Sequence, residues 1–141
     1  MSIKNLIPRD IYSFFLKKKF SPSRFIDDKN LKIKIATTKD EYEAGLKLLH
    51  DCYTAKSYME PDPSGLFFNS FALLPETNLI IALLNDTVIG SVYLYKDSYL
   101  GLPSDTYYLS INDYYRKTEC RLAEVSAFAV AKPYRNKDQS V

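Results

Sequence analysis

The 141 residues are enough for one domain with a single core, and 46% of them are hydrophobic against 26% charged. This balance excludes a disordered chain, and only 4 glycines and 2 cysteines exclude collagen-like and disulfide-dense proteins. A net charge of +2 is too small to indicate a nucleic-acid partner, and no apolar run approaches the ~18 residues of a membrane span. We therefore expect a cytoplasmic protein without nucleic-acid binding or integral membrane association.

Residues 1–30 are predicted to form a short amphipathic helix and a linker. The stretch 9–19 has hydrophobic residues at helical spacing and ends in Lys17, Lys18 and Lys19, which suit the negative end of a helix dipole. Such a helix would dock onto its own domain, or its basic end would contact a membrane surface, a nucleic acid or an acidic carrier protein. The Ser, Pro and Asp content of 21–30 indicates a linker.

A strand and a helix are predicted next. From 31 to 35, Leu and Ile alternate with Lys, which is the period-two pattern of a strand with one face in water. Thr38 and Glu41 have the spacing of a capping box, and hydrophobic residues follow at helical intervals. The sequence therefore predicts an amphipathic helix of about 20 residues that ends before Pro61.

The second half of the chain alternates strands and helices. Residues 66–74 are hydrophobic without a clear period, so they form either a short helix or a flap. Residues 78–84 and 88–95 are strand-like and flank a polar turn, which predicts a β-hairpin. A helix from Pro103 to about Lys117 and a strand at 121–131 complete an α/β or α+β domain, residues 31–141, around a mixed sheet.

The last predicted strand contains one carboxylate, Glu124, among apolar residues. In an extended chain Glu124, Ser126, Phe128 and Val130 share one face, while alanines dominate the other and allow a helix to approach. A buried carboxylate must be paired or open to a cavity. The first alternative is an ion pair with Arg116 or Arg121. The second is a functional carboxylate whose pKa is raised by apolar neighbours, so that it accepts a proton near neutral pH.

The hairpin NLIIALLNDTVIGSVYLY, followed by a helix and by AEVSAFAVAKPYR, resembles the N-terminal half of the GCN5-related N-acetyltransferase (GNAT) superfamily over about Leu31 to Arg135. Within it, LGLPSDTYY at 100–108 and RLAEVSAFAV at 121–130 are similar to the FeeM-type N-acyl amino acid synthases, relatives of the acyl-homoserine-lactone synthases. The resemblance implies a GNAT-like mixed central sheet flanked by helices. It also implies that the C-terminal part of this fold is missing from the 141 residues.

This resemblance implies an N-acyltransferase that moves an acyl group from an acyl-carrier-protein or acyl-CoA thioester to an amine such as an amino acid. Glu124 then lies at the position of the base or amine-orienting carboxylate, and Ser126 orients the acceptor or is an ordinary strand serine. The main chain of Phe128, Ala129 and Val130 would bind pantetheine, with a nearby N–H stabilising the thioester oxyanion. The thioester is a substrate, and no permanently bound cofactor or metal is expected.

The chain departs from the superfamily pattern after Arg135, the first residue of the coenzyme A loop. Two small residues normally follow it, but this chain has Asp138 and Ser140 at those positions, and Asp138 would repel a phosphate. The departure favours carrier-protein donors over coenzyme A. It also leaves open a truncated, non-catalytic module that binds an acyl carrier or another protein.

Three smaller groups of residues complete the predictions. Cys52 and Cys120 belong to no metal-binding motif and are expected to be buried thiols. His50 is expected to have a core or helix-surface role. A set of aromatic residues is expected either to line an acyl tunnel or to pack in the core: Tyr53, Tyr58, Phe67, Phe68 and Phe71.

Overall fold

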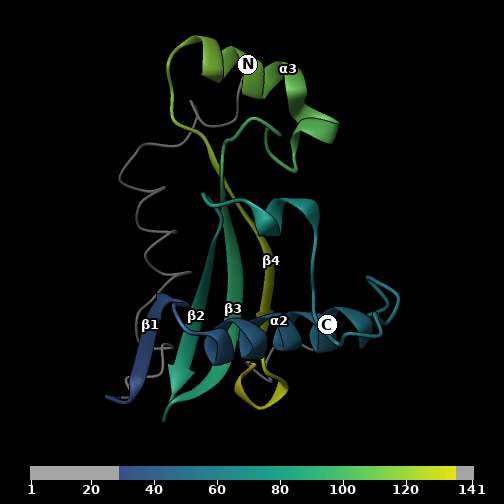
Figure 1. The fold of residues 1–141 in the computed structure, drawn as a ribbon, viewed down its shortest axis with the longest axis vertical. Helices are drawn as coiled ribbons and strands as arrows, with labels where there is room; N and C mark the ends of the chain where they lie inside the picture. The colour runs from purple at the N-terminus through teal and green to yellow at the C-terminus, as the bar shows by residue number, and fades with distance from the viewer. Residues whose placement is uncertain (1–28, 136–141) are drawn as a thin grey trace, which may run out of the picture.

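The computed structural model describes residues 29–135, which form a four-stranded sheet crossed by one long helix, with a second helix at the far end of the sheet (Figure 1). The elements are β1 (Leu31–Ile35), α2 (Lys39–Thr54), the 3-10 helix η3 (Ser70–Leu73), β2 (Asn78–Leu84), β3 (Thr87–Lys96), α3 (Asp105–Lys117), β4 (Ala123–Val130) and η4 (Lys132–Tyr134). The predicted fold class is confirmed. The described strands lie in the order β1-β2-β3-β4 and every pairing is antiparallel, so α+β is the better description.

Two features predicted from sequence lie outside the described residues: the helix and linker before residue 29, and the departure at Asp138 and Ser140. Within the described range, no helix has both the length and the apolar character needed to cross a bilayer.

Helix α2 begins where the sequence predicts. Thr38 caps it, and the capping box with Glu41 is complete. The Glu41 carboxylate also accepts a hydrogen bond from Lys34 Nζ at 2.8 Å, and this bond, with those from the Thr37 and Thr38 amides, lowers the Glu41 pKa to about 2. The helix is 16 residues long, shorter than predicted. It ends early because Ser57 takes a left-handed φ of 56°, which turns the chain back so that the Tyr58 amide bonds to the Tyr53 carbonyl at 2.9 Å.

The predicted hairpin is confirmed. Its turn consists of Asn85 and Asp86, with φ values of 49° and 60°. Two consecutive left-handed residues match the twist of the strands they join, and Asn and Asp tolerate this conformation better than other non-glycine residues. The hydrophobic segment 66–74 forms a loop and then the 3-10 helix η3, so the predicted short helix is correct only for Ser70–Leu73.

The core lies between α2 and one face of the sheet. It contains Leu46 and Leu49 of α2, Leu79 and Ile81 of β2, and stacked Tyr93 and Tyr95 of β3, all 5% exposed or less. Gly45 allows the close approach of the helix, because a Cβ atom there would lie 2.8 Å from Leu79 Cδ2. The packing of α2 on the sheet therefore requires a glycine at position 45 as well as the apolar side chains.

The prediction that the lysines of β1 mark its wet face is wrong. Lys34 pairs with Ile81 in the β1–β2 register and so lies on the α2 side, where it bonds to Glu41. Ile33 lies on the other face and is 71% exposed. The reason is that this side of β1 lies beside two carboxylates: Glu41 in the acidic first turn of α2, which pairs with Lys34, and Asp86 in the hairpin turn, which pairs with Lys32. Among the described residues, nothing buries Ile33.

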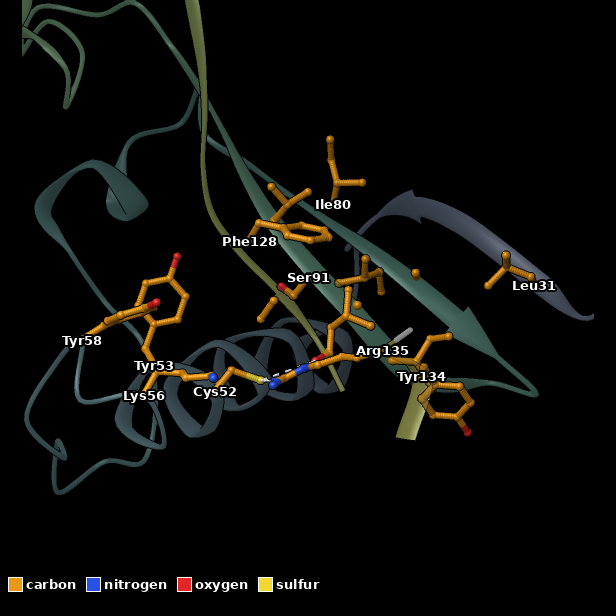
Figure 2. Close-up of a pocket in the computed structure, with 17 residues that line it drawn as sticks. Leu31, Cys52, Tyr53, Lys56, Tyr58, Ile80, Ser91, Phe128, Tyr134 and Arg135 are labelled. Carbon is orange, nitrogen blue, oxygen red and sulfur yellow. Dashed lines mark hydrogen bonds between the residues drawn. The ribbon is translucent and has the colours of Figure 1, made fainter. Parts of the chain in front are cut away.

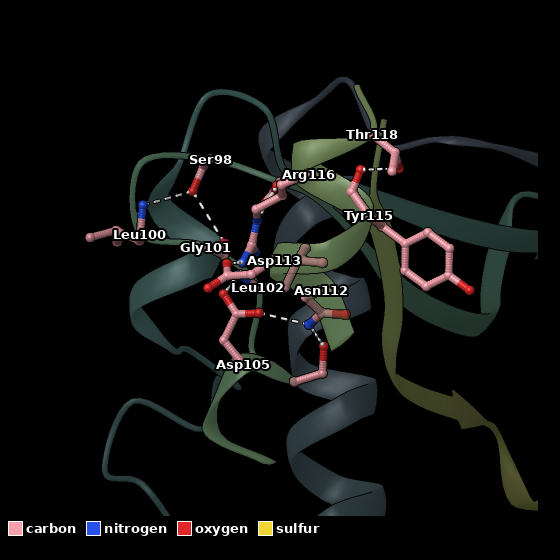
Figure 3. Close-up of polar contacts among 12 residues, drawn as sticks. Ser98, Leu100, Gly101, Leu102, Asp105, Asn112, Asp113, Tyr115, Arg116 and Thr118 are labelled. Atoms are coloured by element: carbon pink, nitrogen blue, oxygen red, sulfur yellow. Dashed lines mark hydrogen bonds and ion pairs between the residues drawn. The ribbon is translucent and has the colours of Figure 1, made fainter. Parts of the chain in front are cut away.

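Helix α3 is held by charges rather than by apolar packing, since none of its residues is buried. Arg116 forms a bidentate ion pair with Asp97 at 2.7 and 2.8 Å. It also contacts Asp105 and Asp113 at 2.8 Å each (Figure 3). These contacts raise the pKa of Arg116. Burial acts to raise the pKa of Asp105, but hydrogen bonds from Arg116, Asn112 and the Leu102 amide outweigh it and lower that pKa.

The cysteine and histidine predictions have different outcomes. Both cysteines are free, but Cys52 is only half-buried and Cys120 is exposed, so the prediction of two buried thiols is wrong. Cys120 follows the end of α3, which packs against little else. His50 is 8% exposed and its Nε2 accepts a hydrogen bond from the Asp62 amide at 3.1 Å, which confirms a core role.

Candidate active site

A β-bulge divides β4 into two halves. Ser126 pairs with Tyr93 and Ala129 pairs with Ser91, so two residues, Ala127 and Phe128, lie opposite the single Val92. Ala127 has a φ of 51°, a left-handed conformation that costs an alanine roughly 1–2 kcal/mol. Strain of this kind persists only where the surrounding structure enforces it, and it is frequent at functional sites.

The bulge overturns the predicted faces of this strand. Glu124 and Ser126 lie on the side of Tyr95 and Tyr93, which is the core side of the sheet. Phe128 lies on the opposite side and is 65% exposed, while Ala129 is buried. The prediction that Glu124 and Phe128 share a face is therefore wrong, because one extra residue shifts the alternation by one position.

A cavity of about 720 Å³ lies beside the second half of β4 (Figure 2). Its walls come from β2, β3 and β4, from Leu31 of β1, from the C-terminal end of α2 with the turn that follows it, and from Tyr134 and Arg135 after β4. All four residues predicted to bind the donor line this cavity: Phe128, Ala129, Val130 and Arg135. The two predicted to act on the acceptor amine, Glu124 and Ser126, are not among its lining residues.

The outer edge of β4 faces the cavity, because β4 is the last strand of the sheet among the described residues. The Ala131 amide bonds to the Ile89 carbonyl of β3 at 2.8 Å, so the main-chain groups of Val130 point away from β3. The Val130 carbonyl accepts a hydrogen bond from Arg135 Nε at 2.7 Å, and Arg135 Nη2 contacts Cys52 Sγ at 2.9 Å. One main-chain group of this edge, the Val130 carbonyl, is thus already bonded to the Arg135 side chain.

Tyr53 is the aromatic residue most closely associated with this edge. Its ring packs edge-on against Tyr58 at 5.7 Å and against Phe67 at 5.2 Å, and Tyr53 and Tyr58 line the cavity. Burial raises the Tyr53 pKa, and the nearby Phe128 main-chain amide partly offsets this. Phe67 packs against the core and Phe68 is 54% exposed, so the predicted aromatic set is divided between cavity, core and surface.

Glu124 is half-buried beside the loop that leads into α3. Its Oε2 accepts a hydrogen bond from the Ser104 amide at 2.8 Å. Within residues 29–135 it forms no ion pair, and the expected partner Arg116 binds three aspartates instead. The predicted ion pair is therefore absent from the described part of the chain. Nearby, burial raises the Tyr95 pKa to about 12, and the charge of Glu124 adds to this shift.

Sequence reasoning missed two features of the site. One is the contact between Arg135 and Cys52, which are 83 positions apart and belong to no common sequence motif. The other is the bulge: a glycine would have marked it, but the left-handed position is occupied by alanine. Within the described chain Ser91 is a further buried group, 2% exposed, whose hydroxyl has no hydrogen-bond partner.

The family model described as N-acyl amino acid synthase FeeM matches residues 44–141. The chain belongs to the FeeM family. Its structure is similar to that of FeeM, an N-acyl amino acid synthase from uncultured soil microbes, with a TM-score of 0.65 and 23% sequence identity. The match covers 79% of this chain and 57% of the FeeM chain, so this family member spans little more than half of that protein. A comparison with curated proteins finds no match. The resemblance to the FeeM-type branch is confirmed.

Proposed function

We propose that this FeeM-family chain carries the donor-binding part of an N-acyltransferase that transfers an acyl group from a pantetheine thioester to the amino group of an amino acid. The observation that carries the proposal is the bulged free edge of β4 beside an apolar cavity. An extended pantetheine arm has amide groups that pair with a free strand edge, and the apolar walls suit an acyl chain. Family membership supports the same reaction.

In the proposed reaction the amine nitrogen attacks the thioester carbonyl carbon, a C–N bond forms, and the C–S bond breaks to release the pantetheine thiol. An α-amino group has a pKa near ~8, so it must lose a proton before it attacks. Glu124 is the proposed acceptor of that proton. It lies three residues before Ala127, roughly 10 Å along the strand, so the proton would pass along a chain of several water molecules. Ser126 lies between Glu124 and Ala127 in the strand and on the same face as Glu124, and it is proposed to orient the amine.

The donor is proposed to arrive on an acyl carrier protein. The reason is the sequence after Arg135, where Asp138 stands at a position that would meet the phosphates of coenzyme A. A carrier protein presents only one phosphate and adds its own protein contacts. Comparing acyl-carrier-protein and acyl-CoA donors of the same chain length tests this point, and equal kcat/KM for both would contradict it.

The decisive experiment uses the full-length protein with an acyl-loaded carrier protein and a panel of amino acids, and detects N-acyl products by mass spectrometry. Glu124→Gln keeps an oxygen that accepts the Ser104 amide hydrogen bond but removes the base, so we expect kcat to fall at least about a hundredfold. The matched control is Glu76→Gln, an exposed carboxylate in the loop before β2, which should not change kcat.

The two outcomes separate the proposal from its alternative. Product formation that depends on Glu124 supports the transferase. Binding of the carrier protein without product, and without any effect of Glu124→Gln, would contradict it and support the non-catalytic binding module.

A further inference from the structure

The face of the sheet opposite α2 is apolar on all four strands. We call it the outer face, and the strand register places on it Ile33 and Ile35 of β1, Ile80 of β2, Val92 of β3, and Val125 and Phe128 of β4. Antiparallel sheets with one face in water commonly alternate apolar residues with polar ones, but β2, NLIIALL, is apolar on both faces after its first residue. A large apolar face of this kind is typical of an interaction surface.

The described helices do not cover the outer face. Helix α2 packs on the core face, where its buried residues lie. The N-cap of η3, Asn69, donates a hydrogen bond to the Tyr95 hydroxyl at 2.8 Å, which places η3 on the core face as well. Helix α3 has no buried residue, and Ile33 and Phe128 at the two edges of the outer face remain exposed. A cover therefore has to come from outside residues 29–135 or from another molecule.

The segment RDIYSFFLKKK, residues 9–19, has a sequence that suits such a cover. It precedes the described residues, and its spacing predicts an amphipathic helix whose apolar side contains Ile11, Phe14 and Phe15. An isolated helix of this length is marginal in water, so it needs an apolar surface to pack against. The lysines at its C-terminal end can keep their ammonium groups in water while the apolar side is buried.

The lengths of this segment and of its connection to the sheet fit the outer face. A helix of 11 residues is about 16 Å long. Four strands that lie ~4.8 Å apart span about 15 Å, so the helix matches the width of the sheet. Residues 20–30 join the segment to β1 and reach roughly 35 Å when extended, which is enough to cross this face. The connection also gives the segment a higher effective concentration at the face than a separate protein would have.

We propose that residues 9–19 form a helix that docks on the outer face, with Ile11, Phe14 and Phe15 packed against the apolar side chains of the four strands. The docked helix also forms a further wall of the cavity, because Ile80 and Phe128 of the outer face line that cavity (Figure 2). This packing is independent of the proposed acyl transfer.

Thiol labelling measures whether the outer face is covered. The 141-residue protein with Cys52→Ser and Cys120→Ser has no cysteine of its own, and one is then introduced by Ile33→Cys on the outer face. Lys32→Cys is the matched control on the other face of the same strand, where the Lys32 side chain is 65% exposed. Each rate of reaction with a maleimide is divided by the rate of the same variant unfolded in urea. We expect Ile33→Cys to react at least about tenfold more slowly than Lys32→Cys, as the burial of one large apolar side chain gives.

A charge on the apolar side of the segment tests which part of the chain is the cover. Phe14→Asp places a carboxylate among apolar contacts, so it should return the labelling rate of Ile33→Cys to that of Lys32→Cys. Ser13→Asp adds the same charge one residue earlier, on the opposite side of the predicted helix, and should leave the protection of Ile33→Cys unchanged. A cooperative thermal transition in both variants would show that the sheet is still folded.

Two results would overturn the proposal. One is an equal labelling rate for Ile33→Cys and Lys32→Cys without any change in the segment, a comparison that does not depend on how Phe14→Asp folds. The other is protection of Ile33→Cys that survives Phe14→Asp. If that protection is lost on dilution and light scattering gives twice the monomer mass, a second copy of the chain covers the face instead. The proposed transferase is tested separately, by product formation.

Discussion

The two helices of the described chain lie at opposite ends of the sheet and are held by different forces (Figure 1). Helix α2 presses Leu46 and Leu49 into an apolar core, whereas α3 has no buried residue and depends on Arg116 and its three aspartates. Thr38 and Glu41 mark the N-terminus of α2 in the sequence, and the predicted start of α3 at Pro103 lies within two residues of its observed start at Asp105. The comparison teaches that such signals predict where a helix forms, but not whether it packs.

The residues of the candidate site are also divided between the α2 end and the α3 end of the sheet. The cavity and Tyr53 belong to the α2 end, and Glu124 bonds to the loop that begins α3. The bulge at Ala127 separates the two. The proposed base is therefore positioned by the charged end of the molecule and the proposed donor site by the apolar end.

The largest effect should come from the apolar end. Leu49 is fully buried, so Leu49→Ala removes apolar contacts and leaves a cavity that should lower the free energy of unfolding by about 2–5 kcal/mol. Leu109→Ala on α3 is the matched control, because Leu109 is 53% exposed and should change stability by less than about 0.5 kcal/mol. Urea unfolding measures both. Similar losses in the two variants would show that α3 packs as α2 does.

A smaller and more local effect is expected at the charged end. Arg116→Gln leaves three aspartates without their shared cation, and charged hydrogen bonds of this kind are worth roughly 1.5–3 kcal/mol. Amide hydrogen exchange should become faster in α3 and in the loop before it, while α2 and β2 keep their protection. The neighbouring exposed Lys117→Gln should leave the α3 amides unchanged. Faster exchange throughout the core would contradict the division into two ends.

The smallest effect concerns pH. Because the Glu41 pKa is lowered from 4.5 to about 2 in the folded chain, its contribution to stability is present above pH 4.5 and is lost as the pH falls toward 2. Glu41→Gln should therefore flatten the fall of the thermal midpoint over this range. Glu43→Gln, an exposed carboxylate on the same helix, is the control. Identical pH profiles for Glu41→Gln and the wild-type protein would show that the Lys34 contact adds nothing.

Much of this architecture follows from local sequence signals. Thr38 and Glu41 mark the start of α2, and Asn85-Asp86 marks the hairpin turn. Both signals are local because capping groups and left-handed turn residues act on their immediate neighbours. The family resemblance predicts that Phe128 to Val130 bind the donor, and the structure places all three along one cavity.

The predictions that failed depend on residues far apart in the chain. Alternation along β4 put Glu124 and Phe128 on one face, and a single extra residue at the bulge separated them. Arg116 was a plausible partner for Glu124, but the end of β3 and the start of α3 bring Asp97 and Asp105 to it instead. Neither outcome is visible in a window of neighbouring residues.

The sequence by itself determined the helices, the strands and the family, because capping, turn geometry and hydrophobic period are properties of short segments. Only the tertiary structure decided which groups meet at the edge of β4. Tyr53 comes from α2, whereas Phe128 and Arg135 come from β4 and the turn after it, and the β3–β4 register and the position of α2 bring these two parts of the chain together. Register depends on the sum of many contacts across the sheet, which no local pattern encodes.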